Sequence, residues 1–485
     1  MKKVKEEFRP LLEKLSLVRW PVVGIGVTAF NRCAPGFFLP DYRMVCQKNS
    51  ADLAVIEKKM KVVCVERDFP REKARRYNSL SILKSRGVKR YLKRLAEENR
   101  GRLGVFVYKS SRNIERICDY YGWRIVGNRA KVRDRWENKK FFREALEKVG
   151  IEPIPAERFS VEEVNWEKVV EVRKRLGGRR VVMRLPEVTR GGGQGTVFVE
   201  TKEDFEKFER VLAERRKKFE LKNVFIAKFI RGESPSMTGC VTRYGVLCGP
   251  LQTQVLDQSL LVDREKGSGL FCGHDWSFGW WPEQVWRQAA RVVRRFGEFI
   301  YKKGYLGVFG IDFLVEENGR VWPVECNPRY TGAFPVFSML QMEAGEPSFD
   351  VFHLLEHLGV DYEVDLEAVQ RLYWRRKEGA HLVLSNRTNR RLRVKGQVRA
   401  GVWRFEKGRI EFVREGFEVG DIKDPEREFV LTDGVPLKGG VVRPRLRCGK
   451  MVFKRRVLET RQRLFAEVAE MVRQVYERMG LEFRI

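Results

Sequence analysis

The stretch GVFGIDFLVEENGRVWPVECNPRYTG, residues 307–332, contains two apolar runs that each hold one acid. Asp312 lies in the first run, Glu325 lies in the second, and Asn318 and Gly319 stand between them. Asn-Gly between apolar runs is a strong signal for a β-hairpin. Counted outward from this turn, the two acids fall near each other across the predicted strand pair. Opposite side chains on paired strands lie about 4.5–5.5 Å apart, so two carboxylates there repel unless a cation lies between them.

The residue types around this hairpin predict a magnesium site. Mg²⁺ prefers hard oxygen ligands, typically one or two carboxylates together with substrate phosphates. Asn327 follows Glu325 by two residues and so faces the same side of a strand, where its amide oxygen can be a third ligand. Pro328 ends the strand, and Arg329 places a cation beside the site. The alternative is a surface hairpin with its acids in water, but the run around Asp312 is too apolar for a solvent-facing strand.

A glycine-rich loop lies upstream, in VVMRLPEVTRGGGQGTVFVE at 181–200. It stands between two extended runs, and Arg184 and Arg190 add positive charge. No GK[ST] follows, so this is not a Walker loop, but a strand–loop–strand hairpin can close over a triphosphate as a lid. The alternative is a plain flexible turn. Four glycines leave backbone N–H groups free to approach a phosphate: Gly191, Gly192, Gly193 and Gly195.

Alternating strand-like and helix-like segments make up residues 1–127. Five apolar segments there are predicted to be strands of a parallel α/β domain: PVVGIGV, YRMVC, KVVCVER, RLGVFVY and RIVGN. One helix is predicted over 133–150, ending at Gly150. Beyond residue 360, two β-hairpins are predicted at 396–422 and 428–444. A final helix carries Leu464, Val468, Val472, Val475 and Met479 on one face.

The charge balance is strongly basic. The 485 residues include 96 Lys and Arg against 65 Asp and Glu, a formal net charge of +31, which attracts polyanions such as nucleotides, nucleic acid or anionic membrane. The alternative is an ion-paired, solvated surface. Two basic stretches, 71–94 and 443–456, leave a nucleic-acid partner open without favouring it, because neither interleaves aromatic residues as a base-stacking platform does.

The nine cysteines and the N-terminus favour a cytoplasmic protein. The cysteines are scattered singly, with no CxxC pair, and most lie in apolar runs, so they are interpreted as reduced, buried thiols. The sequence MKKVKEEFRPLLEKL is charged and amphipathic and has no apolar core of the signal-peptide type. The apolar segment at 21–30 is too short to span a bilayer, so no membrane partner is expected.

These motifs, in this order, resemble the ATP-grasp superfamily. The glycine loop, FIAKFIRGES at 225–234 and above all ECNPRYTG at 325–332 carry the resemblance. It implies an α/β domain at 1–127, an ATP-grasp domain at 128–360 with lobes of about 128–225 and 226–360, and a C-terminal extension of β-hairpins and a final helix at 361–485. The implied fold class is α/β and α+β, in an arrangement similar to that of biotin carboxylase.

The resemblance also implies roles for single residues. Lys139, with Lys140 as competitor, matches a nucleotide-binding lysine, and Arg184 stands where the family usually has a lysine that contacts phosphate. Glu233 is the candidate ribose ligand, with Ser234 in the aligned position of some members. The adenine hinge matches Lys228, Phe229 and Ile230; the metal ligands match Asp312, Glu325 and Asn327; and Arg329 matches an arginine that faces the reacting carboxylate.

The activity that the resemblance implies is ligation. ATP with Mg²⁺, or Mn²⁺, would activate a small-molecule carboxylate as an acyl phosphate, which is then transferred to the amine of an amino acid or peptide-like substrate, releasing ADP and phosphate. A biotin-type carboxylase is less favoured, because no carrier segment is found. The alternative from another class is a basic nucleotide-fold protein that contacts nucleic acid or a protein partner without ligation.

The segment GLFCGHDWSFGWW at 269–281 has two interpretations. In the family a mobile segment between the hinge and the metal strand often lines the acceptor pocket. Trp276, Trp280 and Trp281 would then form an apolar wall for the substrate. The alternative is an ordinary packed loop.

Overall fold

Five short apolar runs of the N-terminal part form a parallel sheet. The computed structural model describes residues 5–72, 77–188, 195–263, 269–279 and 281–481, and in it these strands follow the order β3-β2-β1-β4-β5. The strands are β1 (Val22–Gly26), β2 (Tyr42–Cys46), β3 (Lys61–Cys64), β4 (Gly104–Val107) and β5 (Arg124–Ile125). The helices are α1 (Arg9–Ser16), α2 (Ala51–Glu57), α3 (Val65–Asp68), α4 (Ser79–Lys84), α5 (Arg86–Glu97) and α6 (Arg112–Tyr121). The predicted parallel α/β layer is confirmed.

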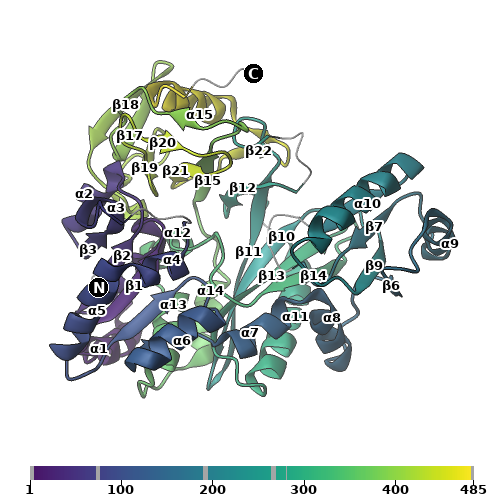
Figure 1. Cartoon of the computed structure of the whole chain (residues 1–485), viewed down its shortest axis with the longest axis horizontal. Coiled ribbons are helices and arrows are strands. Elements are labelled where there is room, and N and C mark those ends of the chain that lie inside the picture. The colour runs from purple at the N-terminus through teal and green to yellow at the C-terminus, as the bar shows by residue number, and fades with distance from the viewer. Residues whose placement is uncertain (1–4, 73–76, 189–194, 264–268, 280, 482–485) are drawn as a thin grey trace.

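A small antiparallel lobe follows. Its four strands follow the order β6-β9-β7-β8, and Figure 1 shows it projecting from the rest of the molecule together with α9 and α10. The strands are β6 (Ala156–Ser160), β7 (Val181–Arg184), β8 (Thr196–Val199) and β9 (Asn223–Lys228). The helices of this part are α7 (Ala130–Glu137), α8 (Lys139–Lys148), α9 (Trp166–Leu176) and α10 (Lys202–Arg216). The lobe has a hydrophobic core of its own, which includes Val169, Met183 and Phe208.

The helix predicted over 133–150 is wrong as a single element. It is broken at Asn138, whose backbone is extended and whose side chain accepts a hydrogen bond from the Lys140 N–H. Asn138 therefore caps a new helix, α8, because its amide oxygen satisfies a backbone donor that the helix start leaves free. The break places Lys139 at the first position of α8.

A ten-stranded sheet forms the centre of the molecule, in the order β14-β13-β10-β11-β12-β15-β21-β19-β17-β18. Its first part comprises β10 (Pro235–Thr242), β11 (Gly245–Leu256), β12 (Phe271–Asp275), β13 (Gly307–Val315) and β14 (Val321–Asn327). The helices of this part are α11 (Glu283–Tyr301), α12 (Val336–Glu343) and α13 (Phe349–Leu358). The amphipathic α11 packs on one face of the sheet through Val285, Ala289, Val293, Phe296 and Ile300.

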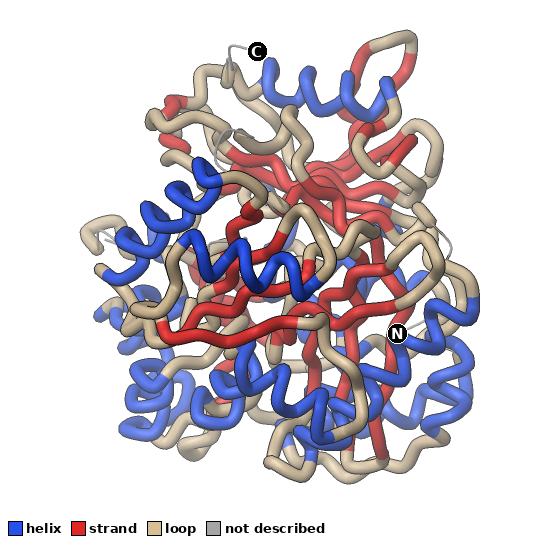
Figure 2. Tube along the Cα trace, turned by 90° about the vertical axis from the view of Figure 1, so that its right-hand side faces the viewer, coloured by secondary structure: helices blue, strands red, loops and turns tan. Residues whose placement is uncertain are grey.

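The C-terminal part continues the same sheet. His381 in β15 pairs directly with His274 in β12, so residues on either side of position 360 share one layer (Figure 2). The strands are β15 (Ala380–Ser385), β16 (Leu392–Arg393), β17 (Gly401–Glu406), β18 (Arg409–Arg414), β19 (Glu428–Thr432), β20 (Val441–Val442), β21 (Arg447–Phe453), β22 (Leu458–Thr460) and β23 (Arg463–Leu464). The helices are α14 (Leu366–Tyr373) and α15 (Ala466–Arg478).

One of the two predicted C-terminal hairpins is correct. β17 and β18 pair as predicted within 396–422. The hairpin predicted at 428–444 is wrong, because β19 pairs with β17 and β21 whereas β20 pairs with β16. Asp433 turns the chain away with a positive φ of 66°, and its carboxylate is held by Thr28 and Asn31 of the N-terminal domain. A contact that is distant in sequence therefore overrides the local hairpin pattern.

The N-terminal domain, the large lobe and the C-terminal part share a core. One apolar cluster joins residues such as Phe106, Phe337, Phe352 and Val430 from these parts. The nine cysteines are buried and unpaired, as predicted. Within the described ranges, none of the helices combines the length and the apolar character that crossing a membrane requires.

Candidate nucleotide and metal site

The predicted hairpin is present as β13 and β14, and it brings the two acids together as predicted. Asp312 lies directly opposite Glu325, and Gly310 lies opposite Asn327. A bulge follows Asp312, so that Phe313 faces Pro323. Ile311 and Phe313 point into the core beneath α11, and the alternation of a strand therefore turns Asp312 to the other face. The two acids thus lie on the side of the sheet that faces away from α11.

Polar neighbours hold the Asp312 carboxylate. Asn327 Nδ2 donates to its Oδ2 at 3.1 Å, and Gln254 Nε2 of β11 donates to its Oδ1 at 3.2 Å. Loss of water contact and, after it, the Glu325 carboxylate raise the pKa of Asp312 above its usual range. Such a shift means that the site disfavours two negative charges when no cation is bound.

The donor set fits a hard divalent cation. Asp312 and Glu325 have carboxylate oxygens at directly paired positions, and Asn327 lies at the next position on the same face. The Asn327 amide oxygen accepts from Arg329 in this structure and would have to turn from Arg329 towards the acids to be a ligand. Nowhere in the described part of the chain do three His, Cys, Asp or Glu side chains gather as a metal site. A third ligand here is therefore the amide or a substrate oxygen, which suits Mg²⁺ better than Zn²⁺.

Two cations from the small-lobe side face Glu325. Lys139 Nζ lies 2.9 Å from Glu325 Oε2, and this ammonium lowers the pKa of Glu325 below its usual range. Arg184, the last residue of β7, has its guanidinium near Val324 O and lies close enough to Glu325 to feel its charge. The Nε of Arg184 is buried and has no hydrogen-bond partner within the described residues. Lys139 and Arg184 are thus positioned to meet an incoming anion beside the two acids.

An apolar seam lies between the two lobes. Ala227 and Ile230 of the predicted hinge pack with Val182 from the small lobe and Trp322 from β14. Lys228 is exposed, and its N–H donates to Pro155 O at 2.8 Å, while Phe229 lies edge-on to Phe198. A cavity of about 50 Å³ opens at this seam, and its lining includes Lys139, Arg184, Phe225, Ala227 and Val324. The lining of this seam therefore combines apolar side chains with the two cations Lys139 and Arg184.

The glycine-rich loop is described only in part. β7 and β8 pair as an antiparallel hairpin on either side of it, as predicted. Gly191, Gly192 and Gly193 lie outside the described residues, and so does Arg190. Gly195 is described: its carbonyl accepts from the Leu185 N–H at 2.8 Å, and a Cβ at this position would lie 2.9 Å from the Val188 side chain. The close packing at the base of the loop therefore requires glycine at 195.

Arg329 lies in a network of the protein's own groups. Its Nη2 donates to Asn327 Oδ1 at 3.0 Å, its Nε lies 3.4 Å from Glu137 Oε1, and its Nη1 donates to the Tyr108 hydroxyl. Glu137 also pairs with Lys109 at 2.6 Å and with Arg133. The Arg329 guanidinium is thus fixed beside Asn327, the third candidate ligand. The side chains of Asn327, Glu137 and Tyr108 hold it there.

Glu233 lies at the edge of the seam. Its backbone forms a bridge with Val315 at the end of β13, through two hydrogen bonds of 2.8 Å. The neighbouring Gly232 permits this approach, because a Cβ there would lie 2.3 Å from Val315 O. The Glu233 side chain is 16% exposed and pairs with Arg461, which lies between β22 and β23. The C-terminal part therefore reaches the predicted ribose ligand, a contact that no local sequence signal indicates.

A row of polar side chains crosses the large sheet from these acids. Directly paired residues of adjacent strands share a face, so their side chains follow one another across the strands. The hydrogen bond from Gln254 to Asp312 and one of 2.9 Å from Gln252 to Ser236 link its first members. This polar row comprises the paired residues Glu325, Asp312, Ser236 and Gln252, then Gln254 two residues along β11, which pairs with His274, and then His381, which pairs with His274. Lys450 and Thr432 pair with each other and continue the row on the same face, because Lys450 lies two residues from Val452, the partner of His381.

The far end of the polar row is a buried cluster with unsatisfied polar atoms. His274 Nδ1, both ring nitrogens of His381 and Lys450 Nζ are buried without a hydrogen-bond partner among the described residues. The N-terminal segment covers them: Phe30 lies over the Lys450 ammonium at 5.3 Å, and the buried Arg32 has no carboxylate within ion-pair distance in the described chain. Buried polar atoms are nearly always satisfied, so this cluster is suited to an anionic ligand or ordered water.

The histidines of the cluster are expected to be neutral at pH 6. Burial lowers the pKa of His274 to about 3 and that of His381 well below its usual range, because the charged imidazolium is costly away from water. NMR of protein carrying ¹³C at the histidine Cε1 positions is therefore expected to show both rings in the neutral form from pH 8 to 5.5. A titration midpoint near 6.5 for either ring contradicts the burial described here.

Comparison with known proteins places this geometry in a known fold. No family model matches the chain. The formate-dependent phosphoribosylglycinamide formyltransferase of Ignicoccus hospitalis is 25% identical over 209 residues, which are 43% of this chain and 48% of that protein. The chain thus spans about half the length of the curated relative it matches.

Three solved structures cover nearly the whole chain. The biotin carboxylase domain of Hydrogenobacter thermophilus 2-oxoglutarate carboxylase, solved with MgADP and bicarbonate, has a TM-score of 0.59 at 14% identity, over 90% of this chain and 86% of that one. Phosphoribosylamine–glycine ligase of Thermotoga maritima has a TM-score of 0.55 at 16% identity, over 95% of this chain and 96% of that one. The N5-carboxyaminoimidazole ribonucleotide synthetase of Thermus thermophilus has a TM-score of 0.52 at 15% identity, over 96% of this chain and 99% of that one.

The fold of this chain is therefore the ATP-grasp fold, with a parallel α/β domain ahead of the two lobes. The resemblance found in the sequence is confirmed at the level of the fold. The C-terminal residues that join the site, Arg461 and Lys450, were not predicted. Lys450 carried a usable signal, because a single charge inside the apolar run CGKMVF indicates a buried functional group.

Proposed function

We propose that the protein is an ATP- and Mg²⁺-dependent ligase, which activates a small carboxylate as an acyl phosphate and transfers the acyl group to an amine. The observation that carries the proposal is the direct pairing of Asp312 with Glu325, with Lys139 at 2.9 Å from the second acid, at the edge of an apolar interlobe seam. A pure binding scaffold has no need of two opposed half-buried carboxylates, so the basic-scaffold alternative is not favoured.

In this proposal the residues of the seam bind ATP. The backbone of Lys228, Phe229 and Ile230 would hold the adenine, Glu233 the ribose, and Lys139 and Arg184 the phosphates. Asp312, Glu325 and Asn327 would hold the cation, whose bound charge offsets the negative charge of the triphosphate. Gly191, Gly192, Gly193 and Gly195 stay candidate phosphate contacts by the sequence resemblance, and of these only Gly195 lies within the described residues.

The proposed reaction has two balanced steps. An oxygen of the carboxylate attacks the γ-phosphorus, the bond to the bridging β–γ oxygen breaks, and ADP leaves. The amine nitrogen then attacks the acyl carbon, the carbon–oxygen bond to phosphate breaks, and the amine loses a proton as inorganic phosphate departs. Arg329, fixed beside Asn327 by Glu137 and Tyr108, would orient the acyl oxygen in both steps.

The buried cluster at the far end of the polar row suggests that the acceptor amine carries an anionic group. Two buried cations lie near it: Lys450 forms an ion pair of 3.5 Å with Asp433 Oδ2, and Arg32 has no carboxylate within ion-pair distance among the described residues. Three strand spacings of about 4.8 Å separate β13 from β12, so the cluster begins about 14 Å from Asp312. The names of two relatives contain a phosphoribosyl amine compound, whose phosphate is an anionic group of the kind proposed.

The test is ADP release with a panel of acids and amines. Formate, bicarbonate and glycine are offered as acids, each with a phosphoribosyl amine or with its unphosphorylated counterpart. We expect ADP release to depend on Mg²⁺ and on one acid, and to be at least tenfold faster with the phosphorylated amine. Lys450→Met is expected to abolish the preference between the two amines. ADP release that needs neither acid nor amine would overturn the ligase proposal.

Arg461 is expected to weaken ATP binding, because Glu233 must leave the ion pair to hold the ribose. Pairs of this kind are worth about 0.2–1 kcal/mol, so Arg461→Ala should lower the KM for ATP by a factor of about 1.4 to 5. Arg463→Ala is the matched control, since Arg463 lies in the same β22–β23 hairpin but pairs with Glu459 at 2.8 Å. A higher KM in Arg461→Ala would mean that the arginine assists ATP binding instead.

A further inference from the structure

The buried Arg32 side chain lies against β1, at a glycine of that strand. A Cβ at Gly26 would lie 2.9 Å from Arg32 Cγ and 3.1 Å from Thr28 O. The Nε of Arg32 donates to Ile25 O at 3.3 Å. Gly26 therefore leaves the space that lets Arg32 lie over the N-terminal sheet.

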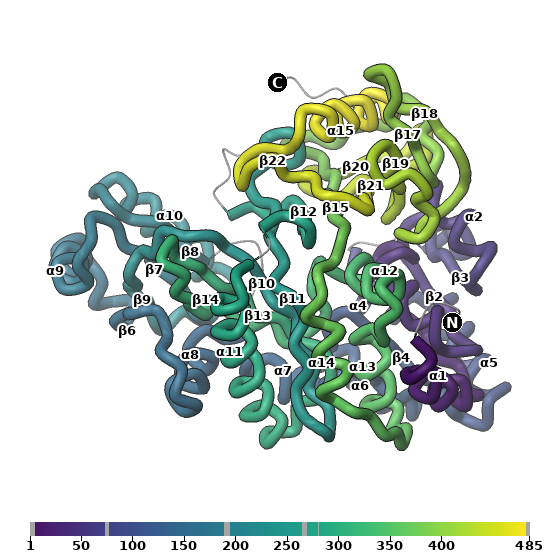
Figure 3. Tube along the Cα trace, turned by 180° about the vertical axis from the view of Figure 1, so that it is seen from behind, coloured from purple at the N-terminus to yellow at the C-terminus, as the bar shows by residue number. Residues whose placement is uncertain are grey.

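Arg32 reaches the ring of Tyr108, which directly follows β4. Its guanidinium carbon lies 5.2 Å from the centroid of the Tyr108 ring and 5.8 Å from that of Phe106, two residues earlier. Phe106 packs on α13, with its ring centroid 6.0 Å from that of His353, and Figure 3 shows β4 beside α13. A guanidinium is attracted to the face of an aromatic ring, and more strongly where water is excluded. The end of β4 therefore holds the Arg32 guanidinium in place.

The same tyrosine holds the arginine of the proposed acyl site. The guanidinium carbon of Arg329 lies 5.0 Å from the centroid of the Tyr108 ring, and its Nη1 donates to the Tyr108 hydroxyl. Arg32 is close enough to Asp433, the ion-pair partner of Lys450, to feel its charge. Tyr108 thus contacts one cation beside the candidate metal ligands and one beside the buried cluster.

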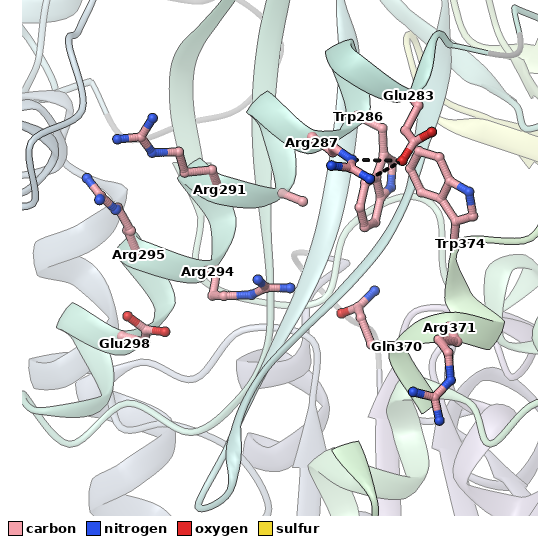
Figure 4. A pocket seen from close by; sticks show the side chains of 11 residues that line it. Glu283, Trp286, Arg287, Arg291, Arg294, Arg295, Glu298, Gln370, Arg371 and Trp374 are labelled. Carbon is pink, nitrogen blue, oxygen red and sulfur yellow. Dashed lines mark hydrogen bonds and ion pairs between the residues drawn. The ribbon is translucent and has the colours of Figure 1, made fainter. Parts of the chain in front are cut away.

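Burial makes these contacts necessary. Arg32 is 7% exposed and the Arg329 side chain is 13% exposed, so protein groups must replace most of the water around both guanidiniums. The groove between α11 and α14 offers a contrast, because its arginines Arg291 and Arg294 are exposed to water (Figure 4). Arg32 and Arg329 are instead fixed by the groups packed around them, as side chains that direct a substrate must be.

We propose that Tyr108 is a positioning residue, which aligns the amine with the acyl phosphate by holding Arg32 and Arg329 at the same time. This inference rests on the proposed ligase function, in which Arg329 would orient the acyl oxygen and Arg32 would bind the anionic group of the amine. A leucine at position 108 would fill part of the same space, but it offers neither a ring face nor a hydroxyl.

Three variants separate the two contacts. Tyr108→Phe removes only the hydroxyl that Arg329 uses, so we expect kcat to fall about tenfold with the KM for the amine within about twofold of wild type. Gly26→Ala places a Cβ against Arg32, so we expect the KM for the amine to rise about tenfold with little change in kcat. Tyr108→Leu removes both contacts and should show both changes. ADP release is measured with the acid and amine that support wild-type turnover.

The KM for ATP should stay within about twofold of wild type in all three variants, because none of them changes the interlobe seam. Tyr301→Leu is the control, since it makes the same change at an exposed tyrosine at the end of α11, and it should leave kcat and the KM for the amine unchanged. Wild-type values of both parameters in Tyr108→Leu would overturn the proposal. An equal rise in the KM for the amine in Tyr108→Phe and Tyr108→Leu would also overturn it, because the ring would then not hold Arg32.

Ligand-free crystal structures of the same variants test the positioning without turnover. We expect Arg329 alone to shift in Tyr108→Phe, Arg32 alone to shift in Gly26→Ala, and both guanidiniums to shift by about 1 Å or more in Tyr108→Leu. Both guanidiniums within about 0.5 Å of their wild-type positions in Tyr108→Leu would contradict the proposal. If the wild-type protein releases no ADP with any acid and amine, the ligase proposal fails on its own test, and these structures still decide whether Tyr108 positions the two arginines.

Discussion

Asp312→Asn is expected to reduce ADP formation by about a thousandfold. The substitution keeps the shape of the side chain but removes one of the two charges that would hold the cation against the triphosphate. Removing one such electrostatic interaction costs about a hundred- to a thousandfold in rate, and removing a metal ligand belongs at the upper end. The rate is measured as ADP released with the acid and amine that support turnover in the wild-type protein.

The fold of Asp312→Asn should be intact, and its melting temperature without Mg²⁺ should be equal or higher. Asp312 directly opposes Glu325, and like charges at paired strand positions destabilise a sheet, so removing one charge relieves repulsion. Glu317→Gln is the matched control, because Glu317 is exposed on the turn of the same hairpin. An unchanged rate in Asp312→Asn, or an equal reduction in Glu317→Gln, would refute the role proposed for the acid pair.

Lys377→Met is expected to lower the free energy of unfolding by about 3–5 kcal/mol. Lys377 Nζ lies 2.7 Å from Glu346 Oε1, and the two side chains are 1% and 0% exposed. Burial raises the pKa of Glu346 to about 7 even though Lys377 opposes this shift. Removing the ammonium would leave the Glu346 carboxylate buried without a counter-charge. Urea unfolding, followed by circular dichroism, measures the change.

Two controls separate this effect from a general loss of charge. Glu346→Gln/Lys377→Met removes both partners and should recover most of the stability, because no unpaired charge stays buried. Arg376→Met breaks the neighbouring exposed pair with Glu378, whose side chains are 49% and 55% exposed, and should change stability by less than about 1 kcal/mol. A double variant as unstable as Lys377→Met would mean that poorer packing, not the unpaired carboxylate, is responsible.

Local sequence patterns predicted those parts of the fold and the site that depend on residues close together in the chain. The Asn-Gly signal predicts a hairpin that brings Asp312 and Glu325 near each other, and in the structure a bulge after Asp312 sets the two acids directly opposite. The five parallel strands and the β7–β8 hairpin likewise follow from apolar runs and their connections. The roles of the individual residues rest on the resemblance and stay proposals, and Gly191, Gly192 and Gly193 lie outside the described residues.

Of the features that the sequence analysis missed, the helix break at Asn138 is local and the others depend on contacts between distant segments. Asn138 interrupts the predicted helix because its side chain caps α8. Its hydrogen bond to the Lys140 N–H competes with the backbone hydrogen bonds that would continue the helix. The hairpin at 428–444 fails because Asp433 is held by Thr28, about 400 residues away. Lys450 belongs to the central sheet through the pairing of β21, and Arg461 reaches Glu233 through an ion pair from the β22–β23 hairpin. The spacing of motifs along the sequence therefore does not predict that Arg461 and Lys450 lie near the candidate site.

The most direct test of the central claim is a crystal structure with Mg²⁺ and a non-hydrolysable ATP analogue. We expect the cation between the Asp312 and Glu325 carboxylates and the β- and γ-phosphates, within about 2.0–2.1 Å of its oxygen ligands, with Lys139 moved from Glu325 towards phosphate. A nucleotide bound elsewhere, or bound in the seam with both carboxylates turned away from its phosphates, would contradict the account.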